Sequence, residues 1–211
     1  AEAGTIDRVS GTATIIGADS VVRPARASEA LNEGDTISTE RSSEVLVKLR
    51  DNSALVVRQA TEVRLAQFRY EQQPTDSMVT RLVKGSLRAV TGLMGKSRPS
   101  GIRFESVTAT IGIRGTDFEL AIVPEGTPDT RGGVYNYVYD GTTNMALETG
   151  ESADVPKEST GFAPENPAPG EPRLQILRER PAFLRGGGFD ALMLNITNQP
   201  RMIPQIMRPM R

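Results

Sequence analysis

The feature that most constrains the fold is the alternation of apolar and polar side chains along residues 12–123. Successive side chains of a strand point to opposite faces, so a period of two with many β-branched residues predicts half-buried strands rather than helices. Strands separated by turns at this spacing predict an all-β fold, either a sandwich or a β-solenoid-like winding. They are expected at residues 12–16, 19–23, 44–49, 53–58, 62–68, 79–83, 85–91, 102–106, 108–113 and 117–123.

Composition changes along the chain predict its organisation. The pattern breaks at 124–133 and resumes at 134–139 and 144–147, where Asp140-Gly141 predicts a hairpin turn. Beyond residue 155, closely spaced prolines are unsuited to a sheet interior. We expect one strand-rich unit with little helix over residues 4–155. The expected division is a β domain at 4–123, additional strands at 124–155, a Pro-rich linker at 156–172 and a C-terminal arm at 173–211.

Missing residue types exclude several chemistries. The chain has no Cys and no His, which removes thiol nucleophiles, disulfides and His-based zinc or triad sites. It has no Trp and few other aromatics, which argues against a glycosidase cleft, and its net charge of -1 argues against nucleic acid. No apolar run is long enough to insert into a membrane. We therefore expect no enzymatic activity, no cofactor and no metal.

Several segments, in register over about 110 residues, resemble the FecR domain, a periplasmic module of Gram-negative bacteria. The resemblance covers roughly residues 4–123. Its most specific parts are a Leu-x-x-Gly-Asp-x-Ile-x-Thr turn, an Asp-x-Ser corner and two later strand segments. In this sequence the turn is at residues 31–39, the corner is Asp51-Asn52-Ser53, and the two later segments are residues 82–93 and 108–118. Gly11-Thr12-Ala13 and Ser43 with Val45 and Val47 also resemble the family.

The resemblance implies a strand-rich, non-catalytic fold that binds other macromolecules of the envelope. We expect a scaffold or adaptor in an envelope protein assembly, whose partner is another envelope protein or further copies of itself. One alternative is a signal-sensing module that binds a TonB-dependent receptor or an anti-sigma system, and another is a peptidoglycan- or glycan-binding protein. The start at Ala1 suits export with a cleaved signal peptide, so the expected location is the periplasm or the outer membrane.

Two glycine motifs within this stretch are expected to be structural. Gly34-Asp35 predicts a turn in which Gly takes positive φ and the carboxylate caps backbone amides. In residues 111–117, Gly112 or Gly115 is expected at a tight corner, with Arg114 held by a carboxylate such as Asp117. The alternative is that Arg114 and Asp117 contact a protein partner.

The arm combines positive charge with apolar residues. Residues 124–172 carry a balance of -7, whereas residues 173–211 carry +5. A short helix is expected where apolar residues recur at helical spacing from Phe189 to Ile196. The arm could lie along its own sheet or dock on another chain, and we expect the second. The candidate contact residues are Phe183, Phe189, Leu192, Met193, Ile196, Met202 and Ile203.

Overall fold

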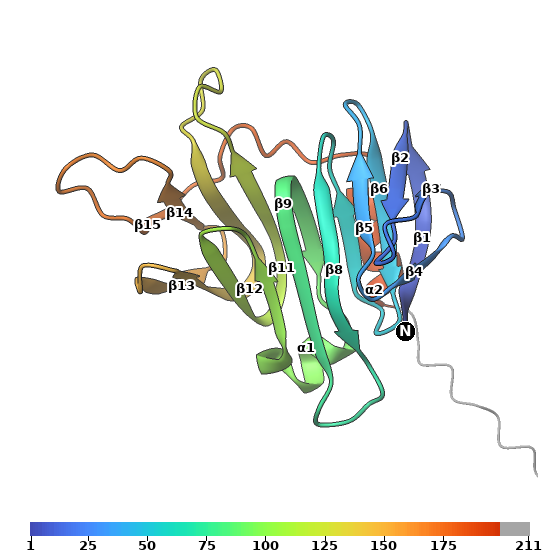
Figure 1. Ribbon diagram of the computed structural model, residues 1–211. Coiled ribbons are helices and arrows are strands. Elements are labelled where there is room, and N and C mark those ends of the chain that lie inside the picture. Colours follow the sequence, from blue (N-terminus) through green and yellow to red (C-terminus); the bar gives the residue numbers. More distant parts are fainter. Residues whose placement is uncertain (199–211) are drawn as a thin grey trace, which may run out of the picture.

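A computed structural model describes residues 1–198 of the chain, and most of them lie in strands (Figure 1). The short helices are α1 (Leu93–Ser97) and α2 (Met193–Thr197), with 3-10 turns η1 (Pro99–Gly101) and η2 (Asp190–Leu192). The strands are β1 (Glu2–Ser10), β2 (Ala13–Ile16), β3 (Val22–Pro24), β4 (Ala30–Asn32), β5 (Thr36–Thr39), β6 (Glu44–Leu49), β7 (Ala54–Val57), β8 (Glu62–Arg69), β9 (Ser77–Val90), β10 (Ile102–Glu105), β11 (Ala109–Val123), β12 (Gly133–Leu147), β13 (Ser152–Pro156), β14 (Thr160–Pro164) and β15 (Gln175–Leu177).

Three long strands fold this single sheet over on itself. β9 contains Gly85, β11 contains Gly115 and β12 contains Gly141, at φ of +84°, +60° and +77°. The first half of β9 pairs with β8 and β10, and its second half pairs with β7 and β11. β11 and β12 change partners in the same way. Layer A therefore runs β4-β1-β6-β7-β9-β11-β12-β14-β15, and layer B runs β3-β2-β5-β8-β9-β10-β11-β12-β13.

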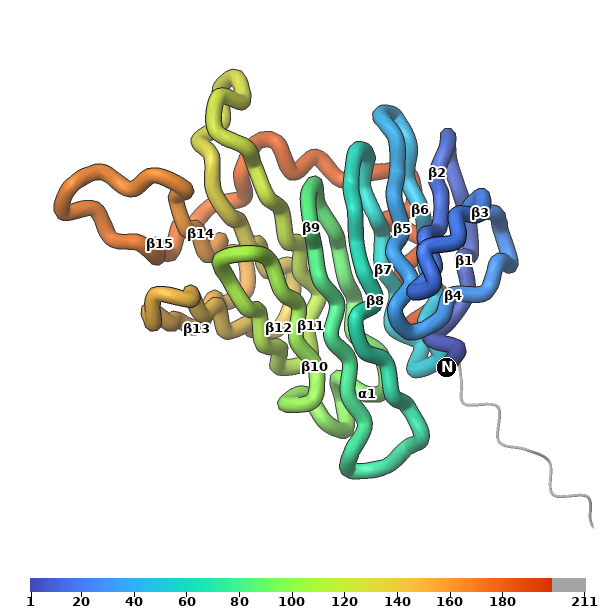
Figure 2. The backbone as a smooth tube through the Cα atoms, in the orientation of Figure 1, coloured from blue at the N-terminus to red at the C-terminus, as the bar shows by residue number. Residues whose placement is uncertain are grey.

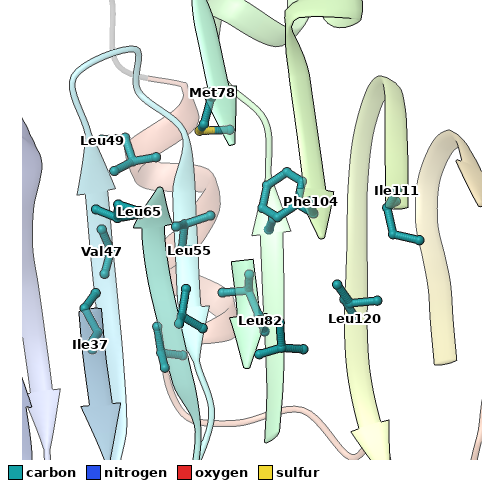
Figure 3. Packing of buried hydrophobic residues seen from close by; sticks show 14 of the residues in the cluster. Ile37, Val47, Leu49, Leu55, Leu65, Met78, Leu82, Phe104, Ile111 and Leu120 are labelled. Atoms are coloured by element: carbon teal, nitrogen blue, oxygen red, sulfur yellow. The ribbon is translucent and has the colours of Figure 1, made fainter. Parts of the chain in front are cut away.

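Apolar side chains between the layers form the main core (Figure 3). Ile37 and Leu65 come from layer B, and Val47, Leu55 and Leu120 come from layer A; each is at most 1% exposed. Burial of such apolar area is the dominant favourable term in folding. This arrangement confirms the all-β, sandwich-like class, and α1 and η1 are the helical segments that the structure places within residues 4–155.

The expected strand boundaries need correction where glycines occur. The segments 79–83 and 85–91 are one strand, and so are 108–113 and 117–123. The hairpin expected at Asp140-Gly141 is wrong, because β12 continues through both residues and bends there into the other layer. A glycine with positive φ permits a bend as readily as a turn, and the local sequence does not distinguish the two.

Six strands lie at residues where no strand was expected: β1, β4, β5, β13, β14 and β15. β1 was missed because the register shifts between Ile6 and Arg8, which breaks the period of two. β14 lies within the expected linker 156–172, and all of its residues are buried. Pro164 is the last residue of β14, a position that the missing N–H of proline tolerates.

The two expected turns are present. In Gly34-Asp35, Gly34 has φ +91° and the Asp35 carboxylate accepts a hydrogen bond from the Asn32 N–H at 3.0 Å. In the corner between β6 and β7, Asn52 has φ +62° and Asp51 accepts the Ser53 N–H at 3.0 Å. Burial raises the pKa of the Asp51 carboxyl, although its hydrogen bonds oppose this.

The same corner holds the start of α1. The Gly92 N–H donates to the Ser53 hydroxyl at 2.9 Å, and the Leu93 N–H donates to the Asp51 carbonyl at 2.7 Å. Gly92 lies so close that a Cβ there would be 2.2 Å from the Asp51 carbonyl oxygen and 2.5 Å from the Ser53 nitrogen. Only glycine allows this backbone approach.

We predict that Gly92→Ala lowers the free energy of unfolding by about 1 to 3 kcal/mol, because the added methyl forces the corner backbone apart. Urea denaturation measures the change. The matched control is Gly112→Ala, where the added Cβ meets its nearest neighbour at 3.9 Å. Equal stability of the two variants would contradict close packing at Gly92.

We predict that Gly115→Val costs about 1 to 3 kcal/mol of stability through backbone strain alone, because its φ is +60° and a Cβ there would have no atom within 4 Å. Gly115→Asn should cost less, since asparagine tolerates the left-handed region. Thermal unfolding of both variants tests this, and the reverse order would rule out strain as the cause.

Candidate functional site

The outer face of layer A is covered by the arm, which the structure describes over residues 174–198. After β15 the chain crosses the molecule, as its orange and red part shows in Figure 2, and it reaches α2 on the side of the sheet away from the viewer in Figure 1. It packs through two apolar clusters. One joins Phe183 and Leu184 to residues of β11, β12 and β14. The other joins Phe189, Leu192, Met193 and Ile196 to Leu46, Ala54, Val56 and Val90.

Between these two clusters lies an ionic clasp, made of Arg58, Arg88 and Asp190. Arg58 follows β7, Arg88 lies in β9, and Asp190 belongs to the arm. The Asp190 carboxylate accepts hydrogen bonds from Arg58 Nη2 at 3.0 Å and from Arg88 Nη1 at 2.8 Å. Charge-assisted bonds of this kind are roughly twice as strong as neutral ones. The clasp therefore ties the arm to two neighbouring strands.

Further acids complete the partners of both arginines. Arg58 pairs with Glu119 at 2.7 Å and with Glu44 at 3.4 Å, and Glu44 also accepts the Phe189 N–H. Arg88 pairs with Asp117 at 2.8 Å. Burial opposes the charge of each arginine, but these acids more than compensate and raise the pKa of both guanidinium groups.

Two other ionisable groups respond to the clasp. Burial opposes the charge of Asp190, but its bonds to Arg58 and Arg88 outweigh this and lower the pKa of its carboxyl. Tyr139 donates a hydrogen bond to Glu119 at 3.0 Å, and the Arg88 guanidinium lies 3.9 Å from the centre of its ring. Burial, followed by the Glu119 charge, raises the pKa of Tyr139.

A cavity of about 520 Å³ lies beside the clasp, under residues 183–189 of the arm. Glu44, Arg58 and Glu119 line its sheet side. Glycines 186–188 span it, and a Cβ at Gly187 would lie 2.2 Å from a carboxylate oxygen of Glu44. Between its two apolar clusters the arm is therefore held by polar contacts, and at Gly187 it lies so close to Glu44 that a side chain there would displace the Glu44 carboxylate.

The charged groups of this site hold the arm on the sheet. Each charged group of the clasp is already paired with an opposite charge, which leaves neither a cation for a substrate anion nor an acid or base poised for proton transfer. Among residues 1–198, no group of three or more acidic side chains converges to hold a metal ion. The arrangement can hold or release the arm.

The structure separates Arg114 from Asp117. Arg114 is exposed, with its guanidinium 3.8 Å from Asp154, whereas Asp117 pairs with Arg88 under the arm. Arg114 thus faces a carboxylate of the domain as expected, but this carboxylate is Asp154 and not Asp117, because the bend at Gly115 turns Arg114 and Asp117 toward different surroundings. The expected positive φ is present at Gly115.

In the single chain, the described part of the arm packs on its own sheet, and docking of its contact residues on another chain stays a prediction. Met193 and Ile196 are 1% and 4% exposed, and Phe183, Phe189 and Leu192 are partly buried beside them. The reason is that layer A presents apolar side chains on its outer face as well as toward the core. The short helix expected here is α2, preceded by η2. Met202 and Ile203 lie outside the described residues.

Sequence reasoning missed the clasp itself. Its signal was a charged residue at an outward position of strands that are otherwise apolar, as at Arg88 between Leu87 and Ala89 and at Glu119 between Phe118 and Leu120. The same pattern is expected for charged side chains that face solvent, so it does not identify a covered site. Only the tertiary position of Asp190 shows that these side chains are covered.

Comparison with known proteins agrees with this architecture. The model of the family described as "FecR protein" matches residues 35–143, about half of the chain. The chain belongs to the FecR family. Its fold is similar to two crystal structures of a "putative anti-sigma factor" from Parabacteroides distasonis ATCC 8503. Each is 12% identical in sequence, with a TM-score of 0.51 over 68% of this chain and 59% of that chain.

This FecR-family chain thus spans about three fifths of the solved protein that it matches. No curated protein matches it. FecR-family proteins are associated with the envelope and are regulatory rather than catalytic. No helix in the described part of the chain is both long enough and apolar enough to cross a bilayer.

We predict that Asp190→Asn loosens the arm while the rest of the fold stays intact. Loss of a charge-assisted interaction worth about 1 to 3 kcal/mol should speed amide exchange in residues 189–198 by roughly 5- to 150-fold, with little change in β9 and β11. The control is Asp154→Asn, an exposed pair at 3.8 Å that should change nothing. Equal exchange in the two variants would show that the clasp does not hold the arm.

The difference in amide exchange between the wild type and the Asp190→Asn variant depends on pH. The pKa of the Asp190 carboxyl is lower when the arm is closed than its ordinary value of 3.8. The ionised carboxylate therefore stabilises the closed arm fully above pH 3.8, and this stabilisation is lost as the pH falls through the lowered pKa. The wild type should therefore approach the Asp190→Asn variant only below pH 3.8.

Proposed function

We propose that the protein is a non-catalytic, protein-binding module of an envelope signalling system, and that its arm reports whether the partner is bound. Family membership supports a regulatory role, and the likeness in fold to the Parabacteroides structures is consistent with it. The scaffold or adaptor role expected from the sequence belongs to the same binding class but needs no movable element. A peptidoglycan-binding role is less favoured, because the aromatic rings that stack within residues 1–198, Tyr135 and Phe162, are buried.

The observation that carries the proposal is the way in which the arm is fastened. A permanently packed arm would bury a continuous apolar strip, whereas this one is held between its two apolar clusters by charged groups beside a cavity that three glycines cross. Elements that move in regulation come from the less stable end of a structure. Release of Asp190 from Arg58 and Arg88 would free the outer face of layer A for a partner.

A periplasmic location after export is part of the same proposal, as is a receptor or regulator as the partner. Contact would involve the arm residues Phe183, Phe189, Leu192, Met193 and Ile196, which face the sheet when the arm is closed. Arg114, which is exposed on the opposite side of the Gly115 bend from Asp117, offers a second contact point.

Crosslinked capture from envelope extracts tests the proposal, with the full chain as bait and the Asp190→Asn and Asp7→Asn variants beside it. Asp7 is exposed, lies 3.5 Å from Arg8 and belongs to neither proposed contact region. We expect a TonB-dependent receptor or a transmembrane regulator to be recovered, and more of it with Asp190→Asn because its arm opens more easily. Recovery that is identical with all three baits would favour a static adaptor. Recovery of the sacculus alone would favour a glycan-binding protein.

A further inference from the structure

A second surface, remote from the clasp, consists of an apolar groove at one open end of the sandwich. Its volume is about 500 Å³, and it opens between the ends of the two layers. Val107 is 74% exposed and Val83 is 43% exposed, so both valines face solvent. Large exposed apolar residues grouped in a groove mark interaction sites more often than single ones do. The other aliphatic residues that line it are Ile122, Val123, Val134, Leu147 and Ala163.

Acidic residues dominate the rim of this groove. Glu148 and Glu165 line it, are exposed and form no ion pair with any described residue, whereas the rim cation Arg173 lies 4.0 Å from Glu151. The groove therefore suits a segment that is both apolar and basic.

The chain contains one such segment at its C-terminal end. Residues 199–211 include three arginines, no acid and the apolar residues Met202, Ile203, Ile206, Met207 and Met210. The segment also contains prolines at positions 200, 204 and 209. We propose that residues 199–211 of a second copy of the chain bind in this groove.

Geometry favours a second copy over the same copy. α2 packs beside Val90, which pairs with Asp117, and the groove begins five residues farther along β11, about 17 Å away. It also lies about three strand spacings across the sheet, roughly 14 Å. Crossing this distance takes about seven extended residues. A tail of the same copy could then place only Ile206, Met207 and Met210 in the groove, whereas a neighbour's tail can use its full length.

The resulting contact joins unlike surfaces, because each copy offers one groove and one tail. Contacts of this type build rings or open chains rather than closed pairs. Contact between copies is separate from the partner binding proposed above, since the groove and the clasp share no lining residue. Loss of either function would leave the other unchanged.

Sedimentation velocity on the full chain tests the proposal, at concentrations up to about 0.5 mM so that a Kd of about 0.1 mM or tighter is seen. The wild type should form species larger than a monomer, in amounts that rise with concentration. Val107→Lys should weaken this association at least tenfold. The matched control is Val22→Lys, on a valine of β3 that is 62% exposed and lies far from the groove in the sheet order.

Mixing two defective chains provides the sharper test. Val107→Lys has a blocked groove and an intact tail, and Ile203→Asp/Ile206→Asp has a blocked tail and an intact groove. Each alone should be monomeric, and an equimolar mixture should form dimers but nothing larger. A wild type that stays monomeric, equal effects of Val107→Lys and Val22→Lys, or a mixture that stays monomeric would each overturn the proposal.

Discussion

The structure depends on three strands that pass from one layer to the other without a break. β9, β11 and β12 bend at glycines with positive φ, so the same strands supply both walls of the core. The bend at Gly85 brings the second half of β9 between β7 and β11, where Arg88 lies opposite Val56 and Glu119. The clasp follows from this register, because it aligns the two arginines and their acids in a row across neighbouring strands. A side chain other than glycine at these bends would strain the backbone.

The sequence predicts the class of the fold well and its connections poorly. Alternation in segments such as Glu44–Leu49 identifies half-buried strands, and the corner at Asp51-Asn52-Ser53 is present as expected. Segments on either side of a glycine look like two strands, although in β9, β11 and β12 they are one. Whether a glycine ends a strand or bends it depends on the strands that pair beyond it, and those partners are distant in sequence.

The candidate site was harder to predict for a related reason. All four residues of β7 are apolar and buried, which indicates a strand covered on both faces, but the sequence does not say what covers the outer one. The arm was recognised as an element that must be covered, yet its apolar residues fit a partner as well as its own sheet. Arg58 and Asp190 are 132 positions apart, so no local pattern connects them.

The distance in sequence between Asp190 and the two arginines of the clasp also determines the order in which the molecule is completed. Every strand of layer A except β15 precedes the arm in the chain, and synthesis proceeds from the N-terminus at about 5 to 20 residues per second. The outer face of layer A, with Leu46, Val56 and the two arginines, is therefore assembled before Asp190 has been made. A nascent chain therefore exposes this apolar and cationic surface for several seconds. During that interval another protein can bind the surface before the arm is available to cover it.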